Sequence, residues 1–426
     1  MANDPTREAA FALLMAVFEQ RRQMDDALNQ LPAMDARDRA AGHRLAAAVL
    51  RRSGTLDAVL EPFLRKAPPD KVRTILRIGA AGLLLLDTPP HAAVATSVAL
   101  ARSQGLVPFS GLVNAVLRKV ASGGRGAMDL LDSPRLDTPS WLWTSWGADA
   151  RIIAEAHQQE APVDLTIGPL WGGPRGGPRG GPAGGADGEA PEGGVVLPSG
   201  SVRFPPGTSV TAIPGFAEGR FWVQDAAASL PARLLAARPG ERILDLCAAP
   251  GGKTAQIAAT GAVVTALDRD PERLERLAEN LHRWHLAATL IQADAMNWQS
   301  PELFDAVLLD APCGATGTIR RHPDVPHLKR PRDIKMLAGN QDLLLAAAAR
   351  MLKPGGRLIY AVCSLQPEEG APRLPASGLR HVPFQPDELP ELPEAITSDG
   401  TLRTHPGMWP LLGGMDGFFA ARLVRD

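Results

Sequence analysis

The chain has 426 residues, of which 45% are hydrophobic and 21% are charged. This length is too great for one ordinary core, so we expect two or three domains. No apolar run reaches the roughly 18 residues that cross a bilayer, and the N-terminus lacks the pattern of a secretory signal. We therefore expect a cytoplasmic protein with no membrane partner.

The net charge of −1 is unevenly distributed. Residues 1–125 hold 17 Lys and Arg against 11 Asp and Glu. A basic segment of this kind suits contact with a phosphate backbone, although a solvated Arg-rich surface explains it equally well. Charge alone therefore leaves a nucleic-acid partner open.

Residues 1–125 are predicted to form a compact, all-helical domain. Apolar residues recur at three- and four-residue spacing through residues 5–121, and no strand-like alternation interrupts them. Gly and Pro mark the breaks between helices. Residues 126–220 then predict a linker and a small irregular subdomain. Its segment 172–194 is rich in Gly and Pro and is expected to be a disordered spacer.

Residues 221–426 predict an α/β domain. Short apolar runs alternate with helical segments, which implies right-handed crossovers and a parallel sheet covered on both faces. Strands are expected at residues 242–247, 263–268, 289–292, 306–310 and 356–363, and helices at 226–237, 254–259, 271–285 and 340–352. Residues 416–424 should add an antiparallel strand at the edge of the sheet.

The segment ILDLCAAPGGKTAQIA, residues 243–258, is the most informative one. A buried strand, a turn of small residues and a helix follow one another, and ligands of open parallel sheets bind at such turns. The turn AAPGGK, residues 248–253, does not fit the G-x-G-x-x-G fingerprint of dinucleotide-binding proteins. A phosphate-binding P-loop is also excluded, because Cys247 stands where its first glycine is needed.

Two carboxylates stand where a nucleoside would need them. Asp268 ends the second predicted strand and is expected to accept hydrogen bonds from ribose hydroxyls, whereas Asp270 is expected only to cap a helix. Asp294 follows the third strand and is expected to bind the adenine amino group. Since no pyrophosphate motif is present, these positions favour S-adenosylmethionine as the ligand.

The three cysteines, Cys247, Cys313 and Cys363, all lie beside these motifs. Their spacing matches neither a zinc site nor a disulfide framework, so no metal is expected. Cys247 is predicted to be a small buried residue of the strand. Cys313 and Cys363 follow the fourth and fifth strands and should face the same crevice as the cofactor.

Two cysteines and an acid at strand ends suit methylation of cytosine at C5. Addition of a thiolate to C6 makes C5 nucleophilic toward a sulfonium methyl group, after which the C5 proton and the thiol must leave. Either Cys313 or Cys363 could attack, with the other helping release, while Asp310 hydrogen-bonds to N3 and the exocyclic amine. Chemistry alone does not decide which cysteine attacks.

The motifs resemble those of the NOL1/NOP2/Sun family of RNA 5-methylcytosine methyltransferases. The resemblance covers roughly residues 221–369, including DLCAAPGGKT, DAPCGATGTIRRHPD and VCSLQPEE. The helical region is similar to the NusB-type RNA-binding domain, most plainly in FSGLVNAVLRKV at residues 109–120. The combination resembles the bacterial branch that acts on 16S ribosomal RNA.

The resemblance implies a class I methyltransferase fold with a mostly parallel, seven-stranded Rossmann-like sheet. It implies that Cys363 is the nucleophile, that Cys313 assists release, and that Asp310 and Lys253 lie in the active site. The implied S-adenosylmethionine ligands are Cys247, Ala248, Ala249, Pro250, Gly251, Gly252, Lys253, Asp268, Arg273, Asp294, Ala295 and Asp310.

The chain departs from the family at PVDLTIGP, residues 162–169, where relatives carry an Arg- and Asn-containing strand. It also departs at GAPRLPASG, residues 370–378, where a helix is shortened. We expect a monomer bound to small-subunit ribosomal RNA. Alternatives are the same chemistry on transfer RNA, or a non-catalytic RNA-binding assembly factor.

Overall fold

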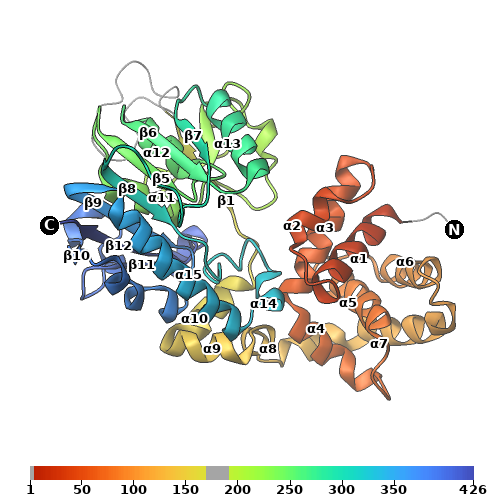
Figure 1. The fold of residues 1–426 in the computed structure, drawn as a ribbon. Helices are drawn as coiled ribbons and strands as arrows, with labels where there is room; N and C mark the ends of the chain where they lie inside the picture. The colour runs from red at the N-terminus through yellow and green to blue at the C-terminus, as the bar shows by residue number, and fades with distance from the viewer. Residues whose placement is uncertain (1–3, 169–190) are drawn as a thin grey trace. The chain divides into compact units, whose positions relative to one another are not determined.

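The computed structural model describes residues 4–168 and 191–426 (Figure 1). The chain divides into two compact units, Met1–Gln159 with Ile319–Arg330, and Glu160–Thr318 with Pro331–Asp426. Most of the predicted Gly/Pro-rich spacer lies outside the described residues, so its disorder and the three-part division at residues 125 and 220 stay predictions. Within the described ranges, no helix is both long enough and apolar enough to cross a membrane.

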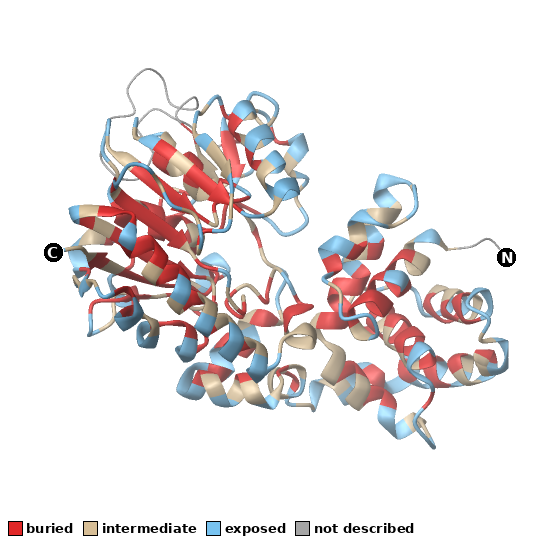
Figure 2. Cartoon of the chain, viewed as in Figure 1, coloured by how far each residue is buried: buried red, intermediate tan, exposed pale blue. Residues whose placement is uncertain are grey.

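The first unit is built from helices, as the spacing of its apolar residues predicts. Asp4 caps the N-terminus of α1 (Pro5–Phe18), because its carboxylate accepts a hydrogen bond from the Arg7 backbone N–H. The inward faces of the helices form a continuous hydrophobic core (Figure 2). The other helices are α2 (Met24–Asn29), α3 (Ala36–Arg51), α4 (Ser53–Leu60), α5 (Asp70–Leu84), α6 (Pro90–Ser103), α7 (Ser110–Asp129), α8 (Ser133–Asp137), α9 (Ser140–Trp146), α10 (Ala150–His157) and α14 (Val325–Leu328).

Residues 319–330 belong to this helical unit, although they come from the middle of the sequence of the α/β region. The buried Asp324 carboxylate accepts a hydrogen bond of 2.9 Å from the Met24 backbone N–H, at the start of α2. A ring nitrogen of His327 lies 3.0 Å from the Leu50 carbonyl oxygen, near the end of α3. The segment that follows the Cys313 turn is therefore part of the packed helical unit.

The second unit begins with a small antiparallel sheet, where the sequence predicted irregular structure. Its strand order is β2-β3-β1-β4, and each neighbouring pair is antiparallel. The alternation in VDLTI produces the central strand, with Leu165 fully buried. The strands are β1 (Val163–Ile167), β2 (Val195–Val196), β3 (Val202–Phe204) and β4 (Phe221–Val223).

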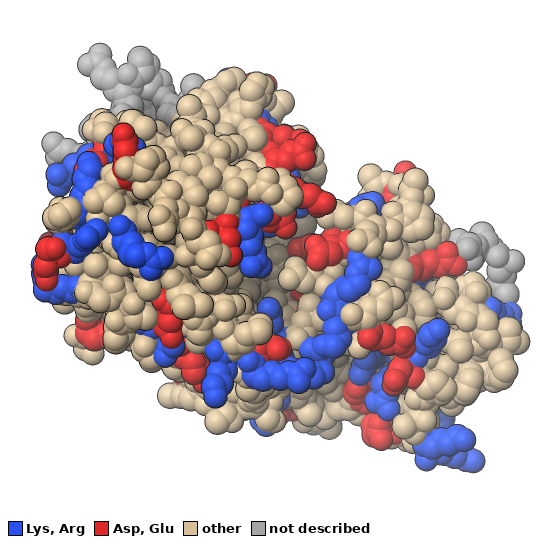
Figure 3. Space-filling model, viewed as in Figure 1, with Lys and Arg blue, Asp and Glu red and all other residues tan. Residues whose placement is uncertain are grey.

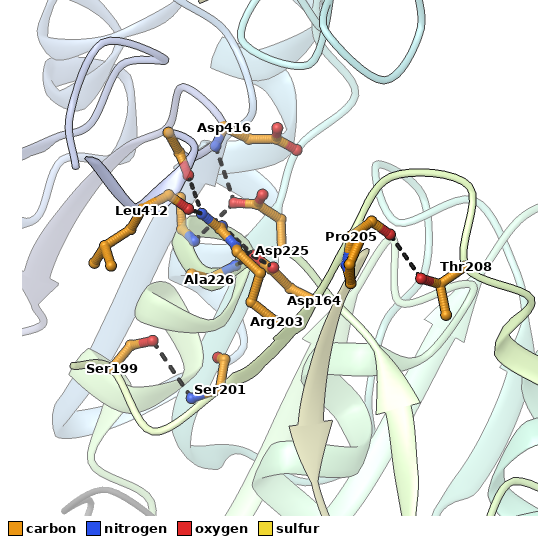
Figure 4. A network of polar contacts seen from close by, with 12 residues as sticks. Asp164, Ser199, Ser201, Arg203, Pro205, Thr208, Asp225, Ala226, Leu412 and Asp416 are labelled. Carbon is orange, nitrogen blue, oxygen red and sulfur yellow. Dashed lines mark hydrogen bonds and ion pairs between the residues drawn. The ribbon is translucent and has the colours of Figure 1, made fainter. Parts of the chain in front are cut away.

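A buried ion pair ties this sheet to the rest of its unit (Figure 4). Arg203 donates from Nε and Nη2 to the two carboxylate oxygens of Asp164, both at 2.6 Å. Its Nη1 donates to the carbonyl oxygens of Leu412 and Gly414, at 2.6 and 2.7 Å. Asp164 also accepts a hydrogen bond from the Ala226 backbone N–H at 3.1 Å. The pair thus joins β1 and β3 to the start of α11 (Ala226–Leu235) and to the C-terminal segment.

Replacing Arg203 with alanine is expected to lower the free energy of unfolding by about 3–5 kcal/mol, because Asp164 then stays buried with its main partner removed. Urea unfolding measures the change. The control is Arg125→Ala, which breaks the exposed pair with Asp87 and should leave the unfolding curve unchanged. Equal curves for Arg203→Ala and wild type would contradict the prediction.

The second unit is dominated by a mixed sheet of order β10-β12-β9-β8-β5-β6-β7, with β11 paired to β12. The strands from β5 to β9 are parallel, and the last three are antiparallel to their neighbours. The strands are β5 (Arg242–Leu246), β6 (Val263–Asp268), β7 (Thr289–Gln292), β8 (Phe304–Asp310), β9 (Leu352–Val362), β10 (Arg380–His381), β11 (Leu402–Arg403) and β12 (Phe419–Val424).

Helices cover both faces of this sheet. Val307 and Leu309 of β8 pack in one cluster with residues of α15 (Pro331–Arg350), whereas Ala306 and Leu308 pack in another cluster with residues of α11. Alternate residues of a strand point to opposite faces, so each strand supplies both layers. The other helices of the domain are α12 (Gly252–Ala258) and α13 (Pro271–Arg283). The predicted fold class, a Rossmann-like α/β domain beside a helical one, is confirmed.

Three details of the prediction were wrong. The described part of the sheet has eight strands rather than seven, because two-residue strands β10 and β11 each pair with β12. For the same reason β12 is not an edge strand but lies between β9 and β10. α15 begins at Pro331 rather than residue 340, since the buried Ile334 and Ala338 extend its apolar face by more than two turns.

The strand order reverses at β5, and in open α/β sheets such a reversal marks the place where a ligand-binding crevice forms, at the carboxyl ends of the strands. From β5 the chain proceeds outward to β6 and β7, and then returns to the other side of β5 with β8 and β9. The turns that follow β5 and β8 therefore diverge, and ligands bind at such switch points. The Gly-rich turn, Asp310 and both cysteine turns all lie at this end of the sheet.

Candidate active site

The turn after β5 has a backbone that few side chains allow. Cys247 and Gly251 have φ angles of +59° and +105°, and the Ala249–Pro250 peptide bond is cis. A Cβ atom at Gly251 would lie 2.1 Å from Leu277 Cδ1, so the close approach of α13 requires glycine there. Ala248 and Ala249 are buried, whereas Pro250 is exposed. The small residues of the motif therefore let the turn fold tightly at the crevice.

Asp268, at the end of β6, supports this turn. Its side chain is 2% exposed, and it accepts hydrogen bonds of 3.1 Å from the backbone N–H groups of Ala249 and Asp270. Arg273 lies 3.6 Å from the same carboxylate and donates to the Ala249 carbonyl oxygen. Asp270 accepts a hydrogen bond from the Arg273 backbone N–H, which confirms its predicted role as the cap of α13.

The residues after β7 differ in what they offer a ligand. Asp294 is exposed, and its carboxylate accepts a hydrogen bond of 2.9 Å from the Met296 backbone N–H. Ala295 is only 4% exposed and packs in the hydrophobic core. Asp294 therefore presents a carboxylate at the strand end, while Ala295 helps to position it by packing.

Lys253 of α12 and Asp310, at the end of β8, form an ion pair with Nζ 2.7 Å from Oδ2. Burial acts to lower the pKa of the Lys253 ammonium, but the Asp310 carboxylate outweighs burial, and the pKa is raised above its usual value. The Phe418 ring lies under the ammonium group, with its centroid 5.2 Å away. Lys253 therefore remains charged at neutral pH and holds one side of Asp310.

Cys313 and Cys363 meet beside this pair, with their Sγ atoms 3.5 Å apart. They follow the neighbouring strands β8 and β9, in which Asp310 pairs with Ala361. The hydrogen bond with Cys363, burial and the charge of the Cys363 thiolate raise the pKa of Cys313 well above its usual value. The structure thus brings together the two thiols that the sequence singled out.

Cys247 has a different environment from the other two cysteines. It packs against the hydrophobic core on one face of the sheet. Burial and the nearby Asp268 and Asp310 raise the pKa of its thiol to about 12. A thiol that stays neutral is a poor nucleophile. This agrees with the prediction that Cys247 is a small buried residue of the strand.

Asp245, on β5 two residues before Cys247, is a buried carboxyl group. Its Oδ2 accepts a hydrogen bond of 2.6 Å from Thr254, while its Oδ1 has no partner among the described residues. Burial raises the pKa of this carboxyl from 3.8 to about 7. The folded protein therefore binds the Asp245 proton more tightly than the unfolded chain does.

This shift predicts a pH dependence of stability. The stabilisation is fully present below the unfolded pKa near 3.8 and is lost as the pH rises through about 7. Within that window, the Asp245 contribution falls by up to about 1.4 kcal/mol per pH unit. Melting temperatures measured between pH 5 and 8 should therefore fall less steeply with pH for Asp245→Asn than for wild type. Parallel curves for the two proteins would show that Asp245 does not titrate as predicted.

A polar network behind the cysteines was missed in the sequence. Glu369 lies in the quoted motif VCSLQPEE, yet two consecutive glutamates after Pro367 are typical of an exposed turn and not of a buried carboxylate. Its partners come from α15 and from both cysteine turns. The only local signal was the motif itself.

Comparison with known proteins agrees with this geometry. Residues 232–424 match the family model "16S rRNA methyltransferase RsmB/F", and residues 4–122 match the NusB family. Ribosomal RNA small subunit methyltransferase B of Salmonella typhi is 36% identical over 438 residues, which covers 98% of this chain and 98% of that protein. The chain belongs to the RsmB/F family of 16S rRNA methyltransferases. The protein of the same name from Salmonella paratyphi B is also 36% identical with the same coverage.

Solved structures show the same fold. PH0851 is 22% identical, covers 99% of both chains and superposes with a TM-score of 0.72. NSun6 from Pyrococcus horikoshii, solved with SFG, is 20% identical over 67% of this chain and 98% of its own, with a TM-score of 0.52.

The predicted family and enzyme class are thereby confirmed. The family is that of S-adenosylmethionine-dependent RNA cytosine-C5 methyltransferases acting on 16S rRNA, with an N-terminal NusB domain. The roles of the individual site residues stay predictions.

Proposed function

We propose that this protein methylates C5 of a cytosine in 16S rRNA, with Cys363 as the covalent nucleophile. The observation that carries the proposal is the contact of the Cys313 and Cys363 thiols, 3.5 Å apart, at the strand ends beside the Lys253–Asp310 pair. A pair of thiols, an acid and a charged ammonium group supply what the chemistry requires.

In the first step, the Cys363 thiolate forms a bond between its Sγ and C6 of the cytosine. The electron pair of the C5–C6 double bond moves toward C5, and C5 takes the methyl group from the sulfonium sulfur of the methyl donor, which keeps the electron pair of the broken S–CH3 bond and leaves as a thioether. The proton of the Cys363 thiol passes to Asp310, whose O–H then donates to N3 while its other oxygen accepts from the exocyclic amine, and the charged Lys253 stabilises the negative charge that addition places on the base. Cys313 remains a thiol at this stage because its pKa is raised by its hydrogen bond with Cys363.

In the second step, the C5 proton leaves and Cys363 is released. Once Cys363 is bonded to C6, its charge no longer raises the pKa of Cys313, so the Cys313 thiol gives up its proton to solvent more readily. The Cys313 thiolate then takes the C5 proton. The C5–H electron pair restores the C5–C6 double bond, and the bond between C6 and Sγ breaks to regenerate the Cys363 thiolate.

The donor set of the crevice fits S-adenosylmethionine, which supplies an electrophilic methyl group. Its ribose hydroxyls, adenine amine and α-ammonium group are all hydrogen-bond donors. The carboxylates of Asp268, Asp294 and Asp310, at the ends of β6, β7 and β8, are acceptors. The turn of residues 247–253 and Arg273 would complete the binding site. None of these groups needs a metal ion.

The RNA substrate is proposed from the helical unit and the relatives. The relatives are named for the small ribosomal subunit, and the NusB-type region carries the surplus of Lys and Arg. Figure 3 shows Lys and Arg side chains gathered on the surface of this unit. Phosphate contacts hold a large RNA, and the target cytosine must be unstacked to enter the crevice. The protein is proposed to act as a monomer in the cytoplasm.

Methyl transfer to defined RNAs tests this function. Purified protein is mixed with labelled S-adenosylmethionine and either unmethylated 16S rRNA or unmodified transfer RNA. Label in one cytosine of 16S rRNA, mapped by sequencing as 5-methylcytosine, is the expected result. Label only in transfer RNA would show that transfer RNA, and not 16S rRNA, is the substrate. No label in either RNA would favour the alternative of a non-catalytic assembly factor.

A further inference from the structure

A fully buried carboxylate, Glu369, lies behind the two cysteines. Its Oε1 accepts a hydrogen bond of 2.9 Å from the Gly314 backbone N–H, and its Oε2 accepts one of 2.5 Å from Ser364 Oγ. Gly314 directly follows Cys313, and Ser364 directly follows Cys363. One side chain therefore binds both cysteine turns at the residue next to each thiol.

The partners on the far side of Glu369 are buried as well. Gln341 of α15 donates from Nε2 to Glu369 Oε1 and to the Pro312 carbonyl oxygen, both at 3.0 Å. The Tyr360 hydroxyl lies 2.7 Å from the Glu369 carbonyl oxygen and 3.0 Å from Gln341 Oε1, so its single proton is shared between these two acceptors. Each of these groups is held by a helix or a strand, so the carboxylate is fixed relative to the sheet.

The Cys313 turn is shaped to approach this carboxylate. A Cβ atom on Gly314 would lie 2.4 Å from Ile334 Cδ1 and 3.0 Å from Glu369 Oε2, so a side chain there would push the turn away. A second tie joins the same two turns, since Thr316 Oγ1 lies 3.1 Å from Ser364 Oγ. Burying a carboxylate has an unfavourable desolvation free energy, whereas an apolar side chain of similar size would fill the same space without it. A buried carboxyl group that is hydrogen-bonded to both cysteine turns therefore indicates a role beyond packing.

We propose that Glu369 is a positioning residue for methyl transfer: through Gly314 and Ser364 it sets the separation and orientation of the Cys313 and Cys363 thiols. This inference rests on the proposed roles of the two cysteines. The negative charge of Glu369 also affects the pKa of the Cys313 thiol. After the hydrogen bond with Cys363, burial and the Cys363 charge, Glu369 adds to the causes that raise the pKa of Cys313. Glu369 thus favours the neutral form of the Cys313 thiol.

The variant Glu369→Gln tests the proposal, because it removes the charge but keeps the size of the side chain. The matched control is Glu368→Gln, which alters the exposed neighbour in the same turn. We expect the kcat of methyl transfer to fall by about 10²-fold in Glu369→Gln, with the KM for 16S rRNA unchanged. The control should match wild type in both parameters.

A second readout separates positioning from simple folding. Alkylation of Cys313 is followed by mass spectrometry as the pH is raised, in both variants and in wild type. The alkylation midpoint should move to lower pH in Glu369→Gln alone, because a negative charge beside Cys313 has been removed. A purely structural role of Glu369 would leave this midpoint where it is.

The outcomes distinguish this inference from the proposed function. Unchanged kcat and an unchanged Cys313 midpoint in Glu369→Gln, with active wild type, would overturn the positioning role and leave the function intact. Inactive wild type and control would overturn the function itself. If Glu369→Gln does not fold, Ser364→Ala tests the proposal instead, because it removes the hydrogen bond from Ser364 to Glu369 and keeps the Glu369 side chain. Its kcat should fall about tenfold, and a wild-type kcat would overturn the proposal.

Discussion

Replacing Cys363 with alanine is expected to abolish methyl transfer, with a loss of at least about 10⁴-fold in kcat. Without the Sγ–C6 bond, C5 of cytosine is too weak a nucleophile to take the methyl group. The variant also removes the hydrogen bond and the charge of Cys363 that help to raise the pKa of Cys313, but burial and the Glu369 charge remain and still favour the neutral Cys313 thiol, so Cys313 is not expected to replace Cys363. Single-turnover transfer of labelled methyl groups to unmethylated 16S rRNA measures the loss.

The Cys363→Ala protein should still bind both of its substrates. Cys363 is partly buried beside Cys313, and alanine at this position removes only the thiol. Calorimetric titration with S-adenosylmethionine and filter binding of 16S rRNA should therefore give wild-type affinities. Methyl transfer at more than about one hundredth of the wild-type rate would show that Cys363 is not the nucleophile.

Replacing Asp310 with alanine should lower kcat by about 10²- to 10⁴-fold, the range expected for an acid–base group. The variant removes the hydrogen bonds to the cytosine and leaves the Lys253 ammonium buried without its 2.7 Å partner. The pKa of Lys253 then falls, since Asp310 is the main group that raises it against burial. The loss of rate should therefore be largest at high pH, where Lys253 becomes neutral.

A matched control lies on the same strand. Asp305 pairs with Lys353 at 2.6 Å at the other end of β8, away from the crevice. Asp305→Ala removes an equivalent lysine–aspartate pair and should leave methyl transfer at its wild-type rate. If both variants lose activity equally, the effect of Asp310 reflects the stability of β8 and not chemistry.

Much of the site could be predicted because its signals are local in sequence. The turn of residues 247–253 is recognisable from its small residues, which stand between a buried strand and a helix. Asp268 and Asp310 are recognisable because each is the last residue of a mostly apolar strand. Parallel strands then bring these ends to one edge of the sheet. The meeting of Cys313 and Cys363 follows from the adjacency of β8 and β9.

Other features depend on contacts that no local pattern encodes. No helix or strand is predicted around Asp324 and His327, yet this segment packs within the helical unit. Glu369 has the sequence context of an exposed turn and is fully buried, because its hydrogen-bond partners come from distant parts of the chain. The interior place of β12 likewise depends on β10 and β11, each too short to show periodicity.

The most direct test of the covalent mechanism is to trap the protein–RNA adduct. Purified Cys313→Ala is mixed with unmethylated 16S rRNA and S-adenosylmethionine, denatured, and analysed for protein that remains attached to RNA. We predict a stable adduct whose cross-linked peptide contains Cys363, because the C5 proton is no longer removed efficiently, and the adduct should disappear in Cys313→Ala/Cys363→Ala. Absence of any adduct, with methyl transfer at the wild-type rate, would contradict the assignment of release to Cys313. An adduct through Cys313 in the Cys363→Ala protein would reverse the roles of the two cysteines.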